Sequence, residues 1–453
     1  MTVPAVHIKA GGSDLNPAYE VISVDVHAEA NKIPWAEICI LDGDAALRKF
    51  EVSESGDLDL GKKVSISLAY VDAPSSLGPV FEGLITRHAI EMDTRGQILR
   101  IECRHPAFLM TKVRKRMVFE KMADKDIIAK LAASTKGLCS IKGLKLKGPV
   151  HPQMIQYDVT DWDFLLARCK ANGWLVFANG KDLAVQAIAP PAGSAAKDAT
   201  MDFNINEIFS LELALDAEAQ YAKTVVKAYD LPGELPMAEG AGTAGIGPGN
   251  SKPAAIPNLS KGVKQELISP TNLDPAELKA WSKGSIDRSQ MAFYRGRFEL
   301  QGNSKIILGK ACKINGIGTK FDGAAMVSGI RQRVSTSGWT TDVQIGMPHP
   351  EKEDGKTVMS PPANGLVPGF SGIQVGIVQA FKANEKDKYK VLVYLPAMDV
   401  LTNLIWARIG MPFGGGGGKE PAGMMFWPDE GDEVIVGFFN DDPRSAVILG
   451  SLY

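Results

Sequence analysis

The chain has 453 residues, 45% of them hydrophobic and 23% charged, a composition that excludes a disordered or collagen-like chain and fits roughly two to four folded domains. Fifty Lys and Arg against 52 Asp and Glu give a formal net charge of −2, so no overall field directs the chain to nucleic acid or membrane. No run approaches the ~20 apolar residues of a membrane helix. The start lacks the basic and apolar regions of a signal peptide, so we expect assembly in the cytoplasm.

Neither the cysteines nor the histidines are spaced like metal ligands. The six histidines never lie within four residues of one another, and the sequence has no HExxH, GxSxG or P-loop pattern. We therefore predict no catalytic residue, no cofactor and no metal site, and a protein that is not an enzyme. The five cysteines are odd in number and scattered, as reduced and buried side chains are: Cys39, Cys103, Cys139, Cys169 and Cys312.

The first hundred residues alternate between apolar and polar side chains. Alternation with period two, interrupted by turn residues, is typical of antiparallel strands that have one buried face. The number of strands predicts a sheet curled into a barrel. The predicted strands are 19–26, 35–41, 63–70, 80–85 and 98–103.

An α/β unit follows the first strands. Asp124 is a candidate cap for a short helix that Gly137 ends, and Thr160 with Asp163 three residues on has the spacing of a capping box. The second helix stops at Asn172-Gly173, and a buried strand follows. Its apolar stripe, at spacings i, i+3, i+4 and i+7, predicts core packing: Trp162, Leu165, Leu166 and Cys169.

Strands return after residue 208 and are interrupted by an unusual stretch. Gly, Pro and Ala make up more than half of the stretch from Leu231 to Gly262, which predicts a long extended loop. Asp274-Pro275 then reads as an N-cap and first helical position, opening a helix towards Tyr294. The predicted strands on either side are 209–213, 224–229, 297–300, 311–314, 325–331 and 339–345.

The C-terminal part of the chain, 370–453, contains short strands at close intervals. A polar, Pro-rich connector leads to them, and strong turn signals stand at 428–431 and 440–443. This pattern suits a small Greek-key barrel of the OB kind. The predicted strands are 374–381, 390–395, 405–409, 424–427, 433–439 and 446–449.

Three segments resemble binding motifs without meeting their requirements. The run 414–419 lacks the Ser or Thr and the helix start of a phosphate loop, so we predict a hairpin tip. The acidic residues of 429–433 lack EF-hand spacing and predict a solvated turn. The basic run 111–116 predicts a strand with a charged face. Residues 370–453 hold 5 Lys and 2 Arg against 6 Asp and 4 Glu, a net charge of −3 that disfavours nucleic acid.

Three segments together carry a family resemblance. The string from Met425 to Tyr453, with Pro428-Asp429-Glu430-Gly431 and Asn440-Asp441-Asp442-Pro443-Arg444, closely resembles the OB-domain signature of VgrG-type spike proteins. These proteins form the tips of type VI secretion systems, phage-tail-like particles and contractile phage tails. Gln156-Tyr157 with 160–165 resembles the family's helix-before-strand segment, and 328–331 with 338–344 resembles the end of its hub region.

The resemblance implies a mainly β chain with α/β insertions, in which two related hub β-barrels precede a C-terminal OB-fold barrel. We expect the following domains: the first hub barrel in residues 1–110, an α/β insertion in 111–200, the second hub barrel in 201–347 with a Gly/Pro-rich and helical insertion at about 231–294, a linker in 348–369, and the OB-fold domain in 370–453.

The resemblance also implies a structural function. In the family three copies form a ring of six barrels, so we expect a homotrimeric spike that joins a hexameric inner tube to the puncturing tip and helps deliver effectors. The implied partners are inner tube and baseplate proteins, a PAAR-like tip protein and effector cargo, with no nucleic acid and with membranes met only by mechanical puncture.

Two points stay open at the level of the sequence. The particle is either released or membrane-anchored, and the family usually continues into an intertwined β-helix needle, whereas this chain stops at Tyr453. The alternative hypothesis is a tail-associated baseplate protein that degrades the cell wall or binds carbohydrate. Oligomeric mass and peptidoglycan turnover distinguish the two.

Overall fold

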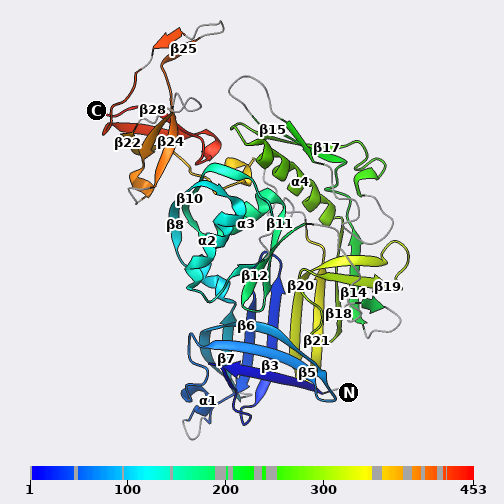
Figure 1. Ribbon diagram of the computed structural model, residues 1–453. Helices are drawn as coiled ribbons and strands as arrows, with labels where there is room; N and C mark the ends of the chain where they lie inside the picture. Colours follow the sequence, from blue (N-terminus) through cyan, green and yellow to red (C-terminus); the bar gives the residue numbers. More distant parts are fainter. Residues whose placement is uncertain are drawn as a thin grey trace.

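The molecule has three regions: a large sheet, an α/β unit inserted between the two stretches of chain that form the sheet, and a small C-terminal barrel (Figure 1). It is mainly β. None of the helices in the described ranges is long and apolar enough to cross a membrane. The computed structural model describes residues 3–44, 49–93, 96–142, 146–188, 200–202, 208–228, 237–240, 253–348, 360–380, 390–398, 403–415, 422–424 and 426–453.

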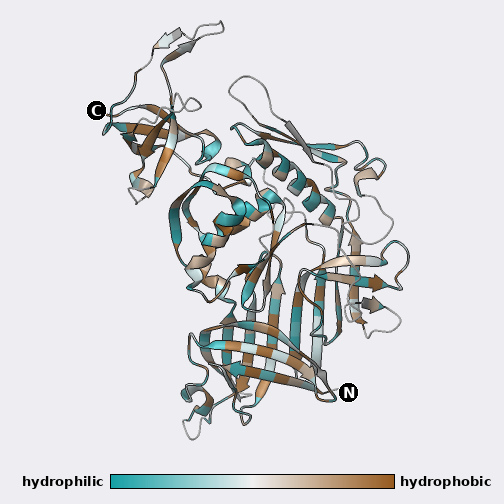
Figure 2. Ribbon diagram, viewed as in Figure 1, coloured by the Kyte–Doolittle hydropathy of each residue, from teal (hydrophilic) through white to brown (hydrophobic). Residues whose placement is uncertain are grey.

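The large sheet has 13 strands and draws on two stretches of chain. Its strands alternate between apolar and polar side chains, as the hydropathy colouring of Figure 2 shows. The first stretch contributes β1 (Pro4–Ala10), β2 (Ser13–Asp14), β3 (Val21–Glu29), β4 (Trp35–Leu41), β5 (Lys63–Tyr70), β6 (Ala73–Asp93) and β7 (Gly96–Arg104), with helix α1 (Glu51–Glu54) between β4 and β5.

The second stretch repeats the strand order of the first. In the first, the neighbours run β3-β4-β7-β6-β5; in the second they run β14-β18-β21-β20-β19, and all of these pairs are antiparallel. We call these two sets repeat 1 and repeat 2. The later strands are β13 (Thr200–Asp202), β14 (Ile208–Leu215), β18 (Tyr294–Gln301), β19 (Ala311–Asn315), β20 (Gly323–Ser335) and β21 (Gly338–Ile345).

The two repeats join edge to edge, and each has its own main apolar cluster. Strand β20 of repeat 2 pairs with β3 of repeat 1, from Gly329 opposite Glu29 to Val334 opposite Val24. The cluster of repeat 1 also takes in Val334 and Trp339 at the ends of β20 and β21, and a second cluster fills the rest of repeat 2. The sequence predicts two hub barrels; the structure places their strands in one sheet, and the two-barrel description stays a proposal.

The α/β unit lies between the repeats in the sequence and has its own core. Thr160 accepts a hydrogen bond from the Asp163 amide at 3.1 Å, and Gly173 ends the helix with φ +67°, both as predicted. The elements are η1 (Pro106–Thr111), β8 (Arg114–Ala123), α2 (Asp124–Leu131), η2 (Ala132–Thr135), β9 (Ile141–Lys142), β10 (Val150–Thr160), α3 (Asp161–Asn172), β11 (Trp174–Asn179) and β12 (Asp182–Ala187).

The prediction for helix α2 is wrong in two respects. Asp124 is the first helical residue and not the cap, because its carboxylate is turned towards Arg168 and His151. The helix ends at Leu131 and not at Gly137, since a 3-10 turn follows and Lys136 adopts the left-handed conformation with φ +53°.

An excursion with its own three-stranded sheet separates β14 from β18. As predicted, Asp274 caps its helix by accepting from the Ala276 amide at 2.8 Å. The predicted loop over 231–262 is wrong at 237–240, because these residues pair with β15. Strand pairing uses only backbone groups, so the side-chain composition of the stretch does not reveal it. Residues 229–236 and 241–252 lie outside the described residues. The elements are β15 (Lys223–Ala228), β16 (Met237–Gly240), η4 (Pro253–Ala255), β17 (Lys264–Ser269) and α4 (Pro275–Met291).

The C-terminal region is a closed five-stranded barrel, which confirms the predicted barrel. The predicted strand 424–427 is wrong, since β26 ends at Met424 and residues 426–428 form no strand. Half of the linker, 349–359, and Phe381 lie outside the described residues. The elements are η5 (Pro362–Gly365), β22 (Gln374–Ala380), β23 (Lys390–Tyr394), η6 (Pro396–Met398), β24 (Leu404–Ile409), β25 (Phe413–Gly415), β26 (Ala422–Met424), β27 (Glu433–Phe438), η7 (Phe439–Asp441) and β28 (Ala446–Ser451).

Candidate functional site: a buried charge network at the barrel junction

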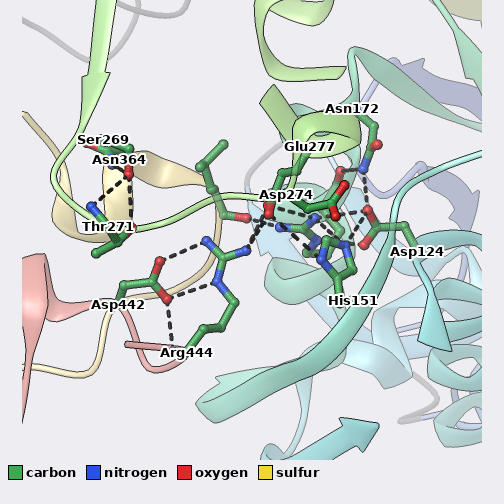
Figure 3. Close-up of polar contacts among 12 residues, drawn as sticks. Asp124, His151, Asn172, Ser269, Thr271, Asp274, Glu277, Asn364, Asp442 and Arg444 are labelled. Carbon is green, nitrogen blue, oxygen red and sulfur yellow. Dashed lines mark hydrogen bonds and ion pairs between the residues drawn. The ribbon is translucent and has the colours of Figure 1, made fainter. Parts of the chain in front are cut away.

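A network of buried charged side chains lies where the barrel meets the α/β unit and helix α4 (Figure 3). Its members come from parts of the chain that are far apart in the sequence, from the start of the α/β unit to the end of the barrel. We call it the junction network. It consists of Asp124 in α2, His151 in β10, Arg168 in α3, Glu277 in α4, and Asp442 and Arg444 between η7 and β28.

Arg168 is the centre of the network within the α/β unit. Its side chain is fully buried, and its Nε and Nη2 donate to the two carboxylate oxygens of Asp124 at 2.8 and 2.9 Å. Its Nη1 donates to the Leu366 carbonyl at 2.6 Å, which lies just after η5. A bidentate pair of this kind fixes both direction and distance, so α3 is tied to α2 and to the chain that enters the barrel.

Arg444 makes the equivalent connection from the barrel. Its Nη1 donates to both carboxylate oxygens of Glu277 at 2.7 and 3.0 Å, while its Nε and Nη2 donate to Asp442 at 2.9 and 2.8 Å. Glu277 also lies 3.4 Å from Nη2 of Arg168. Glu277 therefore joins the two guanidinium groups, and through them helix α4, the α/β unit and the last strand of the barrel.

His151 and Asn172 complete the environment of Asp124. His151 Nε2 lies 3.0 Å from Asp124 Oδ2, and its Nδ1 lies 3.8 Å from Glu277. Asn172 Nδ2 donates to Asp124 Oδ2 at 2.8 Å. Every polar group around this buried carboxylate thus supplies a partner, which is what burial of charge requires.

The network lowers the pKa of two of its carboxyl groups, those of Asp124 and Glu277. Burial alone raises the pKa of Asp124 and of Glu277, but nearby cations reverse this effect. Arg168 and His151 hold the pKa of Asp124 well below its ordinary value, and Arg444 and Arg168 lower that of Glu277. Burial lowers the pKa values of the two guanidinium groups, but Asp124 and Glu277 raise that of Arg168, and Asp442 and Glu277 raise that of Arg444, above the ordinary value.

Aromatic stacking and backbone contacts surround the network. Phe370, between the linker and β22, lies between Tyr157 of β10 and Phe438 of β27, at centroid distances of 3.4 and 4.3 Å with nearly parallel rings. Gln153 of β10 donates through Nε2 to the Leu404 carbonyl of β24 at 3.0 Å. The barrel therefore sits on strand β10 through apolar, aromatic and polar contacts together.

This arrangement is suited to positioning and not to proton transfer. Asp124 and Asp442 each bind an arginine in a bidentate pair, which fixes geometry because the guanidinium fork is planar and rigid, and Glu277 accepts from Nη1 of Arg444 through both of its oxygens. Among the residues that the structure describes, no group of three or more His, Cys, Asp and Glu side chains is placed to hold a metal ion. The chemistry available here is recognition between parts of the chain.

The basic run 111–116 is a strand with a charged face only in part: Arg114 to Arg116 lie in β8, whereas Thr111 ends η1 and residues 112–113 precede the strand. Arg116 Nη2 donates to Asp158 at 3.0 Å, and Lys115 Nζ donates to the buried Asp161 at 2.6 Å. Arg114 donates to the Asp158 carbonyl at 2.9 Å. Because acidic side chains of the neighbouring strand and helix take up these charges, the run presents little cationic surface.

Of the acidic residues of 429–433, Asp429, Glu430 and Asp432 lie in the predicted turn, and Glu433 is the first residue of β27. Asp432 accepts a hydrogen bond from the Asp429 amide at 2.8 Å, and Gly431 supplies the left-handed position with φ +96°. The hairpin tip predicted for 414–419 lies largely outside the described residues, since 416–421 are not described.

Reasoning from sequence assigns other roles to the network residues. It places Asp442 in a turn and Glu277 in the first turn of a helix, and it assigns no role to Arg168. The one local signal is Arg168 itself, a charged residue three positions after Leu165 on a helix face that is otherwise buried. A charge at such a position requires a buried partner.

The C-terminal barrel matches a known protein family. Residues 374–453 match the family described as the type VI secretion system/phage-baseplate injector OB domain. No curated protein matches the chain. The fold is similar to that of an Escherichia coli type VI secretion component described as resembling tail proteins gp27 and gp5 of bacteriophage T4, with 12% identity, a TM-score of 0.57, and coverage of 98% of this chain and 99% of that one.

Two further solved structures share the fold. VgrG in the Francisella PdpA–VgrG complex has 10% identity, a TM-score of 0.58, and coverage of 100% of this chain and 71% of the other. A tail protein from Neisseria meningitidis MC58 has 14% identity, a TM-score of 0.54, and coverage of 76% and 96%. At such identities the likeness concerns the fold.

The sheet, the mounted barrel and these matches together define a chain with the fold of VgrG-type and phage-tail proteins, in which residues 374–453 match an injector OB domain. A second family match covers residues 1–336, well over half of the chain, and therefore shows the family. The chain belongs to the family described as the Alg8 N-terminal domain.

Proposed function

We propose that this chain forms a homotrimer that joins a hexameric inner tube to a puncturing tip and helps deliver effectors across a target membrane. Repeats 1 and 2 are its two hub modules, and residues 370–453 are the OB-fold domain that carries the tip. The remaining divisions, 111–200, the insertion at about 231–294 and the linker 348–369, belong to the same proposal.

One observation carries the proposal: the same order of five antiparallel strands occurs twice and the two sets join in one sheet. A ring of three chains then presents six similar modules, and such a ring matches the symmetry of a sixfold tube. The buried charges of the junction network support it, because they hold the barrel at a fixed orientation to the modules.

The partners in this proposal are inner tube and baseplate proteins, a PAAR-like tip protein and effector cargo. Assembly takes place in the cytoplasm, before the particle is released or anchored. The proposed role is mechanical, so it needs no catalytic group, and the membrane is crossed by puncture.

The test is the mass and symmetry of the purified full chain. Light scattering at micromolar concentration is expected to give three times 48.6 kDa, and class averages of stained particles are expected to show threefold symmetry. A monomer throughout that concentration range would overturn the proposal. Peptidoglycan turnover by the same preparation would favour the alternative of a cell-wall-degrading baseplate protein.

A further inference from the structure

The seam between the two repeats is a pattern that the chain can form again with a second copy. Inside the chain, the last part of β20 pairs with β3. Strand β6 of repeat 1 is the counterpart of β20, and strand β14 of repeat 2 is the counterpart of β3. The question is therefore what pairs with the corresponding edges of β6 and β14.

Shared bulges fix which residues correspond in β6 and β20. β6 bulges at Thr86 and β20 at Ser328, each before the tight hairpin to the next strand. The Thr86 hydroxyl donates to the Glu102 carbonyl at 3.2 Å, and the Ser328 hydroxyl donates to the Gln344 carbonyl at the same distance. Residues 87–92 of β6 thus correspond to 329–334 of β20.

A second pair of bulges aligns β3 with β14. Strand β3 bulges at Ile22 against β4, and β14 bulges at Phe209 against β18. Counting from these bulges, residues 24–27 of β3 correspond to 211–214 of β14. The correspondence between the strands of the two repeats is thus read from the backbone pairing and the bulges, and it does not depend on sequence similarity.

The corresponding edges lack a strand partner in this chain. Among the described strands, β14 stands at one end of the sheet, and residues 87–93 of β6 pair only with β7. At the seam, by contrast, β20 has β21 on one side and β3 on the other. An edge strand left in this state is a template for pairing with another chain.

Burial distinguishes the seam from the two edges. At the seam Val24 and Val334 are 1% and 7% exposed. Met92, the counterpart of Val334, is 58% exposed, and Leu211, the counterpart of Val24, is only half-buried. Ile90 beside them is 43% exposed. The apolar side chains of the two edges therefore require a cover of the kind that the seam provides.

We propose that β14 of one copy pairs antiparallel with residues 89–92 of β6 of a second copy, in the register of the internal seam. In this register Leu211 lies opposite Met92, Leu213 opposite Ile90, and Ala214 opposite Ala89. The inference rests on the proposed trimer and adds to it the interface and its register. Repeated three times, the contact closes all sheets into one ring.

The second copy is favoured over another protein because both halves of the contact are present in every chain. The contact is head-to-tail, because one copy contributes β14 and the next copy contributes β6. Such contacts form a closed ring when each copy is related to the next by a rotation. The seam itself shows that this backbone geometry forms, since β20 and β3 already adopt it.

The polar faces of the seam and of the interface differ. At the seam Arg331 donates to Asp25 through two nitrogens at 2.5 to 3.2 Å. In the proposed register Glu212 faces Glu91, which binds Arg100 of its own chain at 2.8 and 2.9 Å. Like charges directly opposite each other weaken a strand pair, so this contact between copies is weaker than the seam. The chain therefore folds first and assembles afterwards.

Engineered disulfides test the register in the full chain. Opposite residues of antiparallel strands have Cα atoms ~4.5–5.5 Å apart, which a disulfide can span. A mixture of the single variants Ala89→Cys and Ala214→Cys is expected to give a covalent dimer on non-reducing gels, and neither variant alone. The five native cysteines are buried and do not compete. The register control is Ser210→Cys with Ala89→Cys, about 13 Å out of position, which should give none.

The outcomes separate this inference from the proposed function. A trimer that forms no disulfide between 89 and 214 overturns the interface and leaves the trimer standing; a chain that is monomeric by light scattering overturns both. A second test avoids cysteines: Ile90→Asp with Met92→Asp should yield a monomer, while Leu77→Asp, 50% exposed in the first half of β6, should stay trimeric. A trimer in both variants would also overturn the interface.

Discussion

Replacing Arg444 by methionine removes the cation that the barrel contributes to the junction network. The guanidinium donates four hydrogen bonds, two to Glu277 and two to Asp442, and the two carboxylates are only 4% and 2% exposed. Breaking a buried pair by removing one partner costs about 3–5 kcal/mol. Glu277 keeps Arg168 at 3.4 Å, which places the expected loss at the lower end, about 3 kcal/mol.

Native-state hydrogen exchange measures this loss where it occurs. The free energy that protects the amides of β27, β28 and β10 should fall in Arg444→Met, while the amides of β3 to β7 keep theirs. The matched control is Arg114→Met, which removes an arginine that is 69% exposed and 3.6 Å from Asp158. An exposed pair contributes about 0–1 kcal/mol. Equal losses in the two variants would refute the reasoning.

A double-mutant cycle and pH sharpen the test. Arg444→Met combined with Glu277→Gln should cost less than the sum of the two single changes, since each removes the same contact. The folded-state pKa of Glu277 is lowered from about 4.5, so its contribution is present above that pH and is lost as pH falls towards the folded value. The difference between wild type and Arg444→Met should therefore shrink below pH 4.5. Additive losses, or a difference unchanged by acid, would contradict this account.

Two further predictions concern single positions in the fold. Gly173→Ala should lower the free energy of unfolding by about 2 kcal/mol or more in a urea titration, because φ is +67° at this position and a Cβ would lie 2.5 Å from Cα of Gly284. Gly137 is the control: its φ is +78° but the space around it is open, so Gly137→Ala should lose only about 1 kcal/mol in the same titration. Gln332→Leu should cost about 1–3 kcal/mol by thermal unfolding, since its Oε1 accepts from the buried Trp339 indole at 2.8 Å, whereas an unchanged melting temperature would show that water replaces it.

Local chemistry explains what the sequence could predict. The caps at Thr160 and Asp274 and the stop at Gly173 each depend on two or three neighbouring residues, and each is found. The alternation of apolar and polar residues likewise predicts a strand over 19–26, and the structure has a strand over 21–29. The closed barrel follows from short strands and strong turns, both visible in the sequence of 370–453.

Contacts between distant residues explain what it could not. Asp124 looks like a cap because helix starts favour aspartate, yet a buried arginine 44 positions later attracts its carboxylate. Nothing near Arg444 in the chain points to Glu277, 167 positions earlier. The repeated strand order is equally hidden, since corresponding positions such as Ile22 and Phe209 share a bulge and not a residue type.

The network has a mechanical consequence if three copies close as proposed. Apolar contacts such as those of Phe370 allow two bodies to slide, whereas directional hydrogen bonds, such as those from Nη1 of Arg444 to both oxygens of Glu277, restrict their orientation. Arg444 ties the barrel to α4, which lies between β14 and β18 and so belongs to the same repeat that supplies an interface strand. Averaged images of Arg444→Met trimers should therefore keep a sharp ring and lose detail in the barrels, with Arg114→Met unchanged. A barrel equally sharp in both variants would mean that apolar packing alone sets its angle.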